Sequence, residues 1–409
     1  MNENKPKNRH STTVIMTISV LLMVVIAFFT IRACSNGSEP DPVPNNGTGS
    51  IDIIPPDDPS LTDPVNGDGD DITPPILDPI DHESETSPYP GMVRSRITNE
   101  WIWEEAAATR PIAVIVPNSR TASQYGLSQA SVLYECTVEG SMTRLMGIWE
   151  NWDDFDKIGN IRSTRDYFVY WAFEWDALFI HYGATIYCDT ILGRDTTHNI
   201  DCLQYAPASF RDVAKNQVDN AFTNTGRIVN AATTHDYLLS YREGRIAEKH
   251  FNFAAPGWAN TLEQYINAVD AQVIDMSPTY PVTNCYFVYN EETGLYDRFQ
   301  HLAGENAGPH IDLMNGEQLS FKNIIVQNTY YEQRDRQGYL VFQCHDTTRD
   351  GWYFTGGKGI RISWEKTSDY GATRFLDDKR SEIEMNTGKT MILIIQDGDT
   401  FMIDGTRVW

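Results

Sequence analysis

The feature that most constrains this chain is a long apolar run near its N-terminus. Residues 14–31 are eighteen consecutive positions without a charged side chain. At the helical rise of about 1.5 Å per residue the run reaches roughly 27 Å, close to the hydrocarbon thickness of a bilayer. Three basic residues precede it, whereas only Arg32 occurs between it and Arg94. The positive-inside bias therefore predicts a membrane anchor within residues 1–34, with the rest of the chain outside the cytoplasm.

Two forms of anchor fit this run. Residues 31–34 (Ile-Arg-Ala-Cys) resemble a bacterial lipobox in which Cys34 would be lipidated, but Arg32 stands where that pattern has a small or apolar side chain. The run is also longer than the core of a cleaved signal peptide, which is about 7–15 residues. We therefore favour an uncleaved signal anchor over a lipoprotein. Both forms predict the same location, on the extracytoplasmic side of the cell membrane.

An acidic, proline-rich segment follows the anchor. Residues 35–90 contain 12 of the 20 prolines and 13 acidic residues, but neither Lys nor Arg. A segment with low hydrophobicity and charge of one sign cannot repay the entropy of ordering, so we expect a disordered, extended linker. The net charge of the whole chain is -24, which disfavours a nucleic-acid partner because phosphate binding needs clustered Lys and Arg.

Beyond the linker the sequence predicts two domains, an α/β domain at residues 91–258 and a mainly β domain at residues 259–409. In the first, residues 111–116 (PIAVIV) are typical of a strand buried on both faces. A helix at 166–175 and a strand at 177–181 follow, and this alternation favours an α/β layer. The second domain is predicted from strand-like runs separated by glycine and asparagine turns, at 285–289, 323–327, 339–343, 359–365 and 391–396.

A hairpin in the first domain is the most informative stretch for function. Strands at 131–138 and 142–149 are predicted to be joined by a two-residue turn at Gly140 and Ser141. This register places Glu135, Glu139 and Arg144 on one face. Two carboxylates beside a guanidinium are a candidate functional group. The alternative is a solvated charge ladder on an exposed strand, and the sequence leaves both interpretations open.

A second candidate precedes the predicted helix. Ser163 lies three residues before Asp166, a spacing that indicates a capping-box-like helix start. Arg162 and Arg165 flank Ser163 and Thr164. Two guanidiniums at a helix N-terminus suit a phosphate or carboxylate. The alternative is ordinary helix capping with arginines on the surface.

Polar residues also follow two buried strands. Asn118 comes directly after the strand at 111–116, and His181 ends the strand at 177–181, just before the small residues 183–185. Ligands of α/β layers gather where strand ends open into loops. The alternative for His181 is a histidine that merely caps a core strand. Two weaker polar pairs are His235 with Asp236 and His310 with Asp312.

The cysteines and the search for known motifs do not identify a function. Apart from Cys34 there are five cysteines, and by proximity in sequence Cys188 could pair with Cys202 and Cys285 with Cys344. Buried free thiols, including Cys136, are the alternative. The spacing is not that of a metal site, and nucleotide-binding and hydrolase motifs are absent from the sequence, so we expect neither a metal nor a cofactor.

Several linked segments together resemble the YerB family. These are RPIAVIVPN (110–118), YECTVEG with TR (134–144), KIGNIRSTR (157–165), DALFIHYGA (176–184), GPHID (308–312), KNIIVQ (322–327), WEK (364–366) and NTGKTMILI (386–394). The resemblance covers roughly residues 95–400. It implies a bacterial extracytoplasmic protein, usually lipid-anchored, with two adjoining domains of unknown function, and it implies no activity.

The leading hypothesis for function is therefore a membrane-tethered protein that binds an anionic or polyhydroxylated component of the cell envelope. Arg144, Arg162 and Arg165 would hold the charge of the ligand, and Asn118 and His181 would lie at the rim.

Two rival classes stay open. One is a cell-wall glycan hydrolase with Glu139 as acid and Glu135 as base or nucleophile, and with His181 as a third catalytic candidate. Positions four apart on a strand are roughly 13 Å apart, which is wider than the about 5–9.5 Å between the carboxylates of glycosidases. The other is a surface scaffold that binds a protein along an edge of the second domain.

Overall fold

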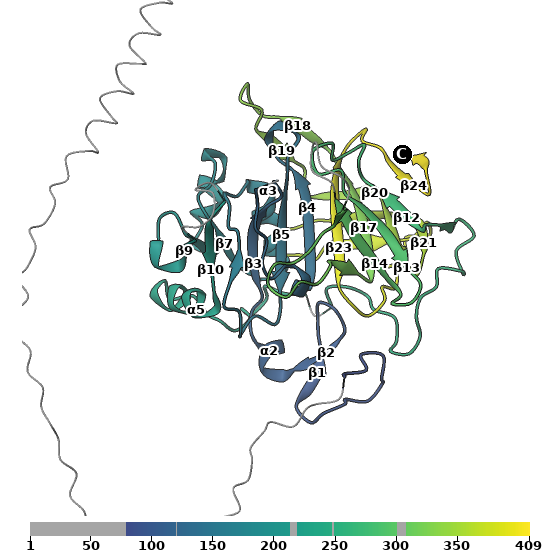
Figure 1. Cartoon of the computed structure of the whole chain (residues 1–409), viewed down its shortest axis with the longest axis horizontal. Coiled ribbons are helices and arrows are strands. Elements are labelled where there is room, and N and C mark those ends of the chain that lie inside the picture. The colour runs from purple at the N-terminus through teal and green to yellow at the C-terminus, as the bar shows by residue number, and fades with distance from the viewer. Residues whose placement is uncertain (1–78, 120, 213–218, 248, 301–307) are drawn as a thin grey trace, which may run out of the picture. The chain divides into compact units, whose positions relative to one another are not determined.

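The computed structural model describes residues 79–409 except residues 120, 213–218, 248 and 301–307 (Figure 1). The predicted membrane anchor, with its apolar run and Cys34, lies outside the described residues. Within the described part, none of the helices has the length and apolar character needed to cross a membrane.

The fold begins earlier than the predicted boundary at residue 91. The guanidinium of Arg94, at the end of strand β1 (Met92–Arg94), donates to the carbonyl oxygens of His82 (2.6 Å) and Ser84 (2.6 Å). These two residues belong to the end of the segment predicted to be a free linker. Its last residues are therefore bound to the fold, because Arg94 satisfies their carbonyl groups.

An eleven-stranded mixed sheet runs through the described residues and contains strands from both predicted domains (Figure 1). Five of its strands come from the first domain and six from the second. Its main path has the order β11 (Val269–Asp270), β21 (Lys358–Lys366), β20 (Asp346–Thr355), β17 (Asn323–Thr329), β23 (Thr390–Gln396), β4 (Val132–Thr137), β5 (Thr143–Trp149), β3 (Ile112–Pro117), β7 (Leu178–His181) and β8 (Asn199–Asp201). Strand β22 (Arg374–Leu376) pairs with β21 outside this path.

The two halves of the sheet meet at β23. This strand pairs in parallel with β17 on one side and with β4 on the other, so that Leu393 lies between Val326 and Glu135. Its sequence, TMILIIQ, is buried at six of seven positions. A continuous apolar run is what a parallel strand covered on both faces requires.

Both faces of the large sheet are covered, and each carries a hydrophobic core. Because side chains alternate along a strand, Leu133 of β4 joins one core while Val132 and Tyr134 join the other. The core on the Tyr134 face includes helix α3 (Asp166–Phe173). The core on the Leu133 face includes helix α5 (Thr225–Thr234) and residues of a second, seven-stranded sheet.

The seven-stranded sheet is built from second-domain segments. Its strands are β15 (Gly308–Pro309), β14 (Leu295–Gln300), β13 (Tyr286–Asn290), β12 (Val273–Asp275), β24 (Phe401–Ile403), β25 (Thr406–Val408) and β16 (Ser320–Phe321). Three small sheets complete the described strands: β1 with β2 (Trp101–Trp103), β6 (Ile158–Gly159) with β10 (Ala221–Thr223) and β9 (Phe210–Arg211), and β18 (Tyr331–Gln333) with β19 (Leu340–Phe342). The other α-helices of the described residues are α2 (Glu104–Ala108) and α4 (Asp189–Leu192).

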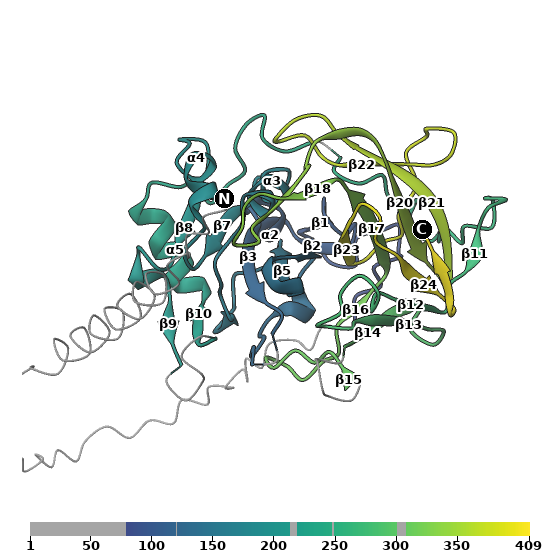
Figure 2. The ribbon, with the colours of Figure 1, turned by 90° about the horizontal axis from the view of Figure 1, so that it is seen from above.

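The predicted fold class is confirmed as a mixed fold with few helices and many strands. Strands β3 and β7 and helix α3 occur within two or three residues of their predicted bounds. The strand-like runs of the second domain correspond to β13, β17, β19, β21 and β23. Turned by 90°, the ribbon shows the strands of the second half gathered beside those of the first (Figure 2).

The predicted hairpin register is wrong by one residue. The turn between β4 and β5 holds three residues, 139–141, and is closed by a bond from the Val138 amide to the Met142 carbonyl (2.7 Å). Glu135 consequently faces Leu145, and Arg144 faces Cys136. A slip of one residue moves a side chain to the opposite face of a sheet, so Arg144 does not share a face with Glu135.

The predicted capping box is also wrong. Helix α3 starts at Asp166, its N-cap residue is Arg165, and no side chain caps it. Ser163 lies outside the helix, and its carbonyl oxygen accepts a bond from Nη1 of Arg144. Asp166 instead pairs with Arg334 of the second half (2.7 Å).

Candidate functional site

Glu135 lies completely buried on β4, where the two halves of the sheet meet. Its Oε1 accepts bonds from Nδ2 of Asn118 (3.0 Å) and Oγ1 of Thr143 (2.6 Å). Its Oε2 accepts from Nη1 of Arg298 on β14 (2.8 Å). The carboxylate is thus enclosed by partners from both halves, which corrects the expectation of a solvated or open position.

This network continues through a neutral histidine. Arg298 donates from Nε to Nδ1 of His310 (2.9 Å), so Nε2 of that ring carries the proton and donates to Oε1 of Gln124. Burial lowers the pKa of His310 well below its ordinary value, and the Arg298 guanidinium lowers it further. This chain of contacts holds the second half of the fold against the first. It also closes the Glu135 carboxylate to a substrate.

The predicted arginine group is engaged with the protein. Arg165 forms a two-point ion pair with Glu139, with Nε 2.7 Å from Oε1. Nε of Arg162 lies 3.4 Å from Oδ1 of Asp219. Arg144 is 8% exposed, and burial together with the nearby Arg165 lowers its pKa to about 9. The first two arginines therefore have acidic partners within the fold.

A polar cleft lies beyond the ends of two parallel strands. His181 ends β7 and Asp201 ends β8, and β7 is also parallel to β3. The carboxyl ends of parallel strands form one edge of the sheet, which is where α/β layers place ligands. The cleft has a volume of about 490 Å³. Its walls are made by His181, Gly183, Ala184, Asp189, Leu192, Gly193, Asn199, Asp201, Leu203, Gln204, Tyr205, His235 and Tyr237.

His181 itself is held firmly at the base of the cleft. Its side chain is 1% exposed, with Nδ1 3.0 Å from the carbonyl of Gly183 and Nε2 3.1 Å from Oδ1 of Asn199. Nδ2 of Asn199 donates to two backbone carbonyls, which fixes the orientation of its amide. Because both ring nitrogens already have partners, His181 shapes the cleft and has no nitrogen left for proton transfer.

The carboxylates of the cleft keep hydrogen-bonding capacity. Oδ1 of Asp201 accepts from the backbone amides of Gly183 (2.7 Å) and Leu203 (2.9 Å), while Oδ2 has no partner among the described residues. Asp189 is exposed in the first turn of α4, and its carboxylate has no partner in the described part of the chain either. Both carboxylates can therefore accept hydrogen bonds from a ligand.

A row of aromatic rings forms another part of the wall. His235 lies between Tyr205, at 5.0 Å between ring centroids, and Tyr237, at 5.5 Å. Tyr237 in turn stacks on His198 at 4.3 Å. The ring of His235 is exposed and forms no hydrogen bond with a described residue. Tyr237 is stacked on both His198 and His235, and Tyr205 stands edge-on to His235, so the row adds aromatic groups to the wall next to the carboxylates.

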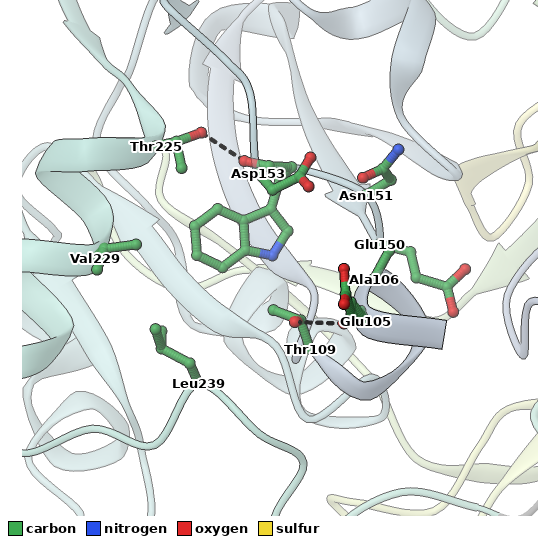
Figure 3. Close-up of a pocket in the computed structure, with 10 residues that line it drawn as sticks. Glu105, Ala106, Thr109, Glu150, Asn151, Asp153, Thr225, Val229 and Leu239 are labelled. Carbon is green, nitrogen blue, oxygen red and sulfur yellow. Dashed lines mark hydrogen bonds between the residues drawn. The ribbon is translucent and has the colours of Figure 1, made fainter. Parts of the chain in front are cut away.

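A second, apolar pocket lies at the opposite edge of the sheet (Figure 3). Its volume is about 250 Å³, and its lining includes Trp152 together with Val229, Leu239 and Thr109, of which the last three are labelled in Figure 3. It adjoins the end of β5, where burial raises the pKa of Glu150 to about 7. Its residues were not singled out by the sequence.

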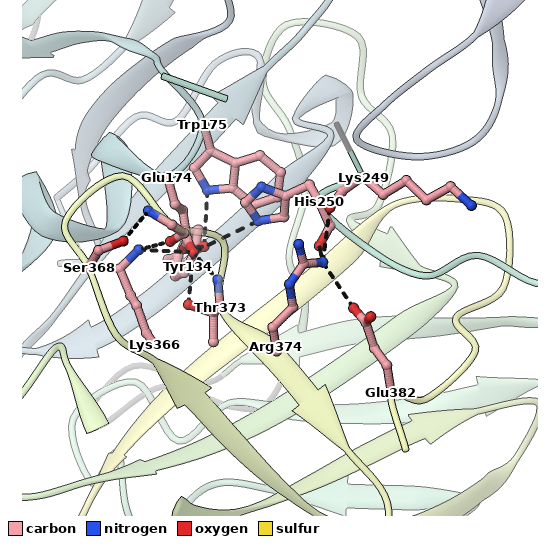
Figure 4. Close-up of polar contacts among 11 residues, drawn as sticks. Tyr134, Glu174, Trp175, Lys249, His250, Lys366, Ser368, Thr373, Arg374 and Glu382 are labelled. Atoms are coloured by element: carbon pink, nitrogen blue, oxygen red, sulfur yellow. Dashed lines mark hydrogen bonds and ion pairs between the residues drawn. The ribbon is translucent and has the colours of Figure 1, made fainter. Parts of the chain in front are cut away.

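A buried ion network joins the two halves on the α3 face of the sheet (Figure 4). Glu174 accepts from Oη of Tyr134 (2.7 Å) and from the amide of Thr373 (2.7 Å), and it lies 3.4 Å from Nζ of Lys366. Burial alone would raise the pKa of Glu174, but the Lys366 ammonium group and the hydrogen bonds from Tyr134 and Thr373 bring it below its ordinary value. Glu174 and these four partners, Tyr134, Thr373, Lys366 and His250, are all buried, so this part of the network serves the fold.

The described cysteines form no disulfide bridge. All five described cysteines are buried free thiols, so neither Cys188 with Cys202 nor Cys285 with Cys344 forms a bridge. No group of three or more metal-ligating side chains is found among the described residues.

Of the residues proposed from the sequence, His181 lines the cleft, with the small residues Gly183 and Ala184 beside it and His235 nearby. Asn118, Arg144, Arg162, Ser163 and Arg165 do not line it. Sequence reasoning missed Asp189, Asp201, Tyr205 and Tyr237. The short strand β8 was the available signal, because Asp201 ends it just as His181 ends β7.

The fold defines a class of two-domain protein in which a single sheet passes through both domains. The family models for the N-terminal and C-terminal domains of a protein of unknown function (DUF3048) match residues 97–238 and 276–392. The chain belongs to this family, and the resemblance to YerB is confirmed. "Putative lipoprotein YerB" of Bacillus subtilis (strain 168) is 25% identical over 305 residues, which are 73% of this chain and 85% of that protein.

A solved structure shows the same fold. The crystal structure of the YerB protein from Bacillus subtilis matches with a TM-score of 0.64 and 21% identity, covering 76% of this chain and 99% of that one.

Proposed function

We propose that this protein is tethered to the outer face of a bacterial cell membrane and binds a polyhydroxylated component of the cell envelope, a glycan, in the His181 cleft. The observation that carries this proposal is the combination found in one cleft of about 490 Å³. Carboxylates with free hydrogen-bonding capacity lie there beside an aromatic row. A sugar ring presents hydroxyl groups at its edge and an apolar face, and these two surfaces match such a combination.

The cleft supports the polyhydroxylated alternative over the anionic one. Asp189 and Asp201 line it, and none of its described lining residues is Lys or Arg. A ligand with negative charge would be repelled there. The arginines first expected to hold a ligand's charge lie elsewhere, and Arg165 already has Glu139 as its partner.

Binding is also favoured over hydrolysis. The hydrolase hypothesis needs Glu135 and Glu139 to flank one substrate, but Glu135 is enclosed by Arg298 and its other partners, and Glu139 pairs with Arg165. His181, the remaining catalytic candidate, has both ring nitrogens occupied. For the scaffold hypothesis, the described residues offer no comparable cluster.

Tethering to the membrane is supported by two observations outside the cleft. Residues 14–31 form an uncharged run of bilayer length with basic residues before it. The Bacillus subtilis relative carries the name "Putative lipoprotein YerB".

The test is calorimetric binding of soluble cell-wall glycan fragments to the full-length protein in detergent. We expect saturable binding that weakens at least tenfold in Asp201→Asn and in His235→Ala, because the first removes an acceptor charge and the second removes part of the aromatic row. Glu105→Gln, in the apolar pocket, which shares no lining residue with the cleft, should bind as the wild type does.

Three other outcomes would count against the proposal. Loss of binding in Arg162→Ala, with the cleft variants unaffected, would favour the anion site. Release of reducing ends that stops in Glu139→Gln would favour the hydrolase. Absence of binding to any fragment would leave the scaffold hypothesis.

A further inference from the structure

We infer that the fold contains an anion-binding site at the N-terminal end of helix α3, built around Arg144, and that this site takes a phosphate group. Arg144 does not line the His181 cleft, so the site is separate from the proposed glycan site and does not depend on it. Arg144 is a buried guanidinium without a counter-ion among the described residues, and free hydrogen-bond donors lie beside it.

Arg144 lies near the start of β5, on the face of the sheet that α3 covers. It is opposite Cys136, which belongs to the core on that face. The residue is 8% exposed, and its Nη1 donates to the carbonyl oxygen of Ser163, three residues before the start of α3. Oη of Tyr167, the second residue of α3, donates to the carbonyl oxygen of Thr137 (3.0 Å). This bond places the first turn of the helix over the end of the same hairpin, so the guanidinium is held at the N-terminal end of α3.

The other arginines around this end of α3 each have an acidic partner. The pairs are Arg165 with Glu139, Arg162 with Asp219, and Arg334 with Asp166. Arg144 has no carboxylate within ion-pair distance in the described part of the chain, because Glu139, the acidic group whose charge reaches it, is held by Arg165. Four guanidiniums and three carboxylates therefore leave one positive charge unbalanced. Burial and the Arg165 charge lower the pKa of Arg144 to about 9, so the side chain is still charged at neutral pH.

Free donors lie beside this charge. No described side chain caps α3, so its first backbone amides lack a side-chain acceptor. Oγ of Ser163 forms no hydrogen bond with a described residue, and the guanidinium of Arg144 has further N–H groups beyond the one bound to the Ser163 carbonyl. The oxygens of a tetrahedral phosphate point in several directions and can accept from all three kinds of donor at once. A planar carboxylate has fewer oxygens to offer them.

The energetics favour an occupied site. A buried cation without a counter-ion destabilises a fold, so a bound anion that supplies the missing charge stabilises the folded protein. Replacing Arg144 by Met, an apolar side chain of similar length, removes both the unbalanced charge and the reason to bind an anion.

The first measurement is calorimetric titration of the full-length protein in detergent at pH 7 and constant ionic strength, with inorganic phosphate, methyl phosphate and acetate as probes. We expect inorganic phosphate to bind saturably and at least tenfold more tightly than acetate. Binding should weaken at least tenfold in Arg144→Met. Arg361→Gln, which removes an exposed arginine of β21, should bind as the wild type does. Methyl phosphate bound as tightly as inorganic phosphate would identify an esterified phosphate as the ligand, and much weaker binding of methyl phosphate would identify the free ion.

Thermal melts separate a ligand site from an arginine that only supports the fold. In phosphate-free buffer Arg144→Met should melt no lower than the wild type, and added phosphate should raise the melting temperature of the wild type alone. A variant that melts more than about 5 °C below the wild type without phosphate would overturn the inference, because Arg144 would then serve the fold. Equal phosphate binding by both proteins would overturn it as well. Neither result bears on the His181 cleft, which the glycan titrations test separately.

Discussion

At the scale of single residues, burial changes the role expected for the charge of Glu135. Its carboxylate is fully buried and is paired with Arg298, which is fully buried too. Breaking such a pair by removing one partner leaves an uncompensated buried charge. Glu135 is therefore expected to matter for stability and not for catalysis.

We predict that Glu135→Gln lowers the free energy of unfolding by about 3–5 kcal/mol, measured by urea denaturation. Gln keeps one acceptor for Asn118 and Thr143 but turns an amide donor toward Arg298. Adding Arg298→Met to this variant should restore part of the loss, because it removes the unpaired charge. A loss below about 1 kcal/mol in the single variant would contradict this account.

At the scale of elements, the packing of strand β5 depends on Gly147. The ring of Trp149 folds back over Gly147, where a Cβ atom would overlap its six-membered ring. Trp149 is fully buried, and its Nε1 donates to the carbonyl of Gly126 (2.7 Å). The strand can therefore keep this indole inside only if residue 147 has no side chain.

We predict that Gly147→Ala lowers the free energy of unfolding by about 1–3 kcal/mol, the usual cost of overpacking. The near-ultraviolet circular dichroism of the tryptophans should change as well, because the indole of Trp149 must move. Gly226→Ala, on helix α5 where a Cβ would make only an ordinary contact with the side chain of Asn224 (3.8 Å), is the matched control. It should be neutral or slightly stabilising, because Ala favours a helix. A Gly147→Ala protein as stable as this control would show that the ring moves freely.

At the scale of the whole molecule, buried charges join the two halves. Glu174 of the first half contacts Lys366 and Thr373 of the second, and His250 stacks on Trp175 with ring centroids 3.5 Å apart. Burial lowers the pKa of His250 to about 3. The ring is therefore neutral in the fold and takes up a proton when the chain unfolds below about pH 6.5.

Acid should therefore destabilise the protein through His250. An imidazole whose pKa is lower in the folded than in the unfolded chain makes the free energy of unfolding fall as the pH drops from about 6.5 toward 3, by at most about 1.4 kcal/mol per pH unit. We predict that His250→Phe, which keeps the stack on Trp175, removes this part of the pH dependence. At pH 7 it should be at least as stable as the wild type, since neither nitrogen of His250 has a hydrogen-bond partner among the described residues.

Thermal melts of both proteins from pH 7 to pH 4 measure this effect. His235→Ala, which removes an exposed ring, should keep the wild-type pH slope. An unchanged slope in His250→Phe would assign the acid sensitivity to other groups, such as Glu174.

The sequence by itself determined the elements and the class of this protein. Continuous apolar runs such as residues 111–116 and 391–396 specify buried strands, because only a strand covered on both faces is apolar throughout. His181 was placed at a strand end for the same local reason. The positions of these strands and of His181 depend on neighbouring residues along the chain, so they can be predicted from a single sequence.

Tertiary structure decided the partners of these elements. One extra residue in the turn at 139–141 moved Arg144 to the other face, and Glu135 found its counter-ion 163 residues away in Arg298. The cleft was assembled from β7, β8, α4 and the end of α5, whose residues are separated in sequence. Pairings of this kind depend on strand register and on packing between residues far apart in sequence. Local hydrophobic periodicity contains no information on either.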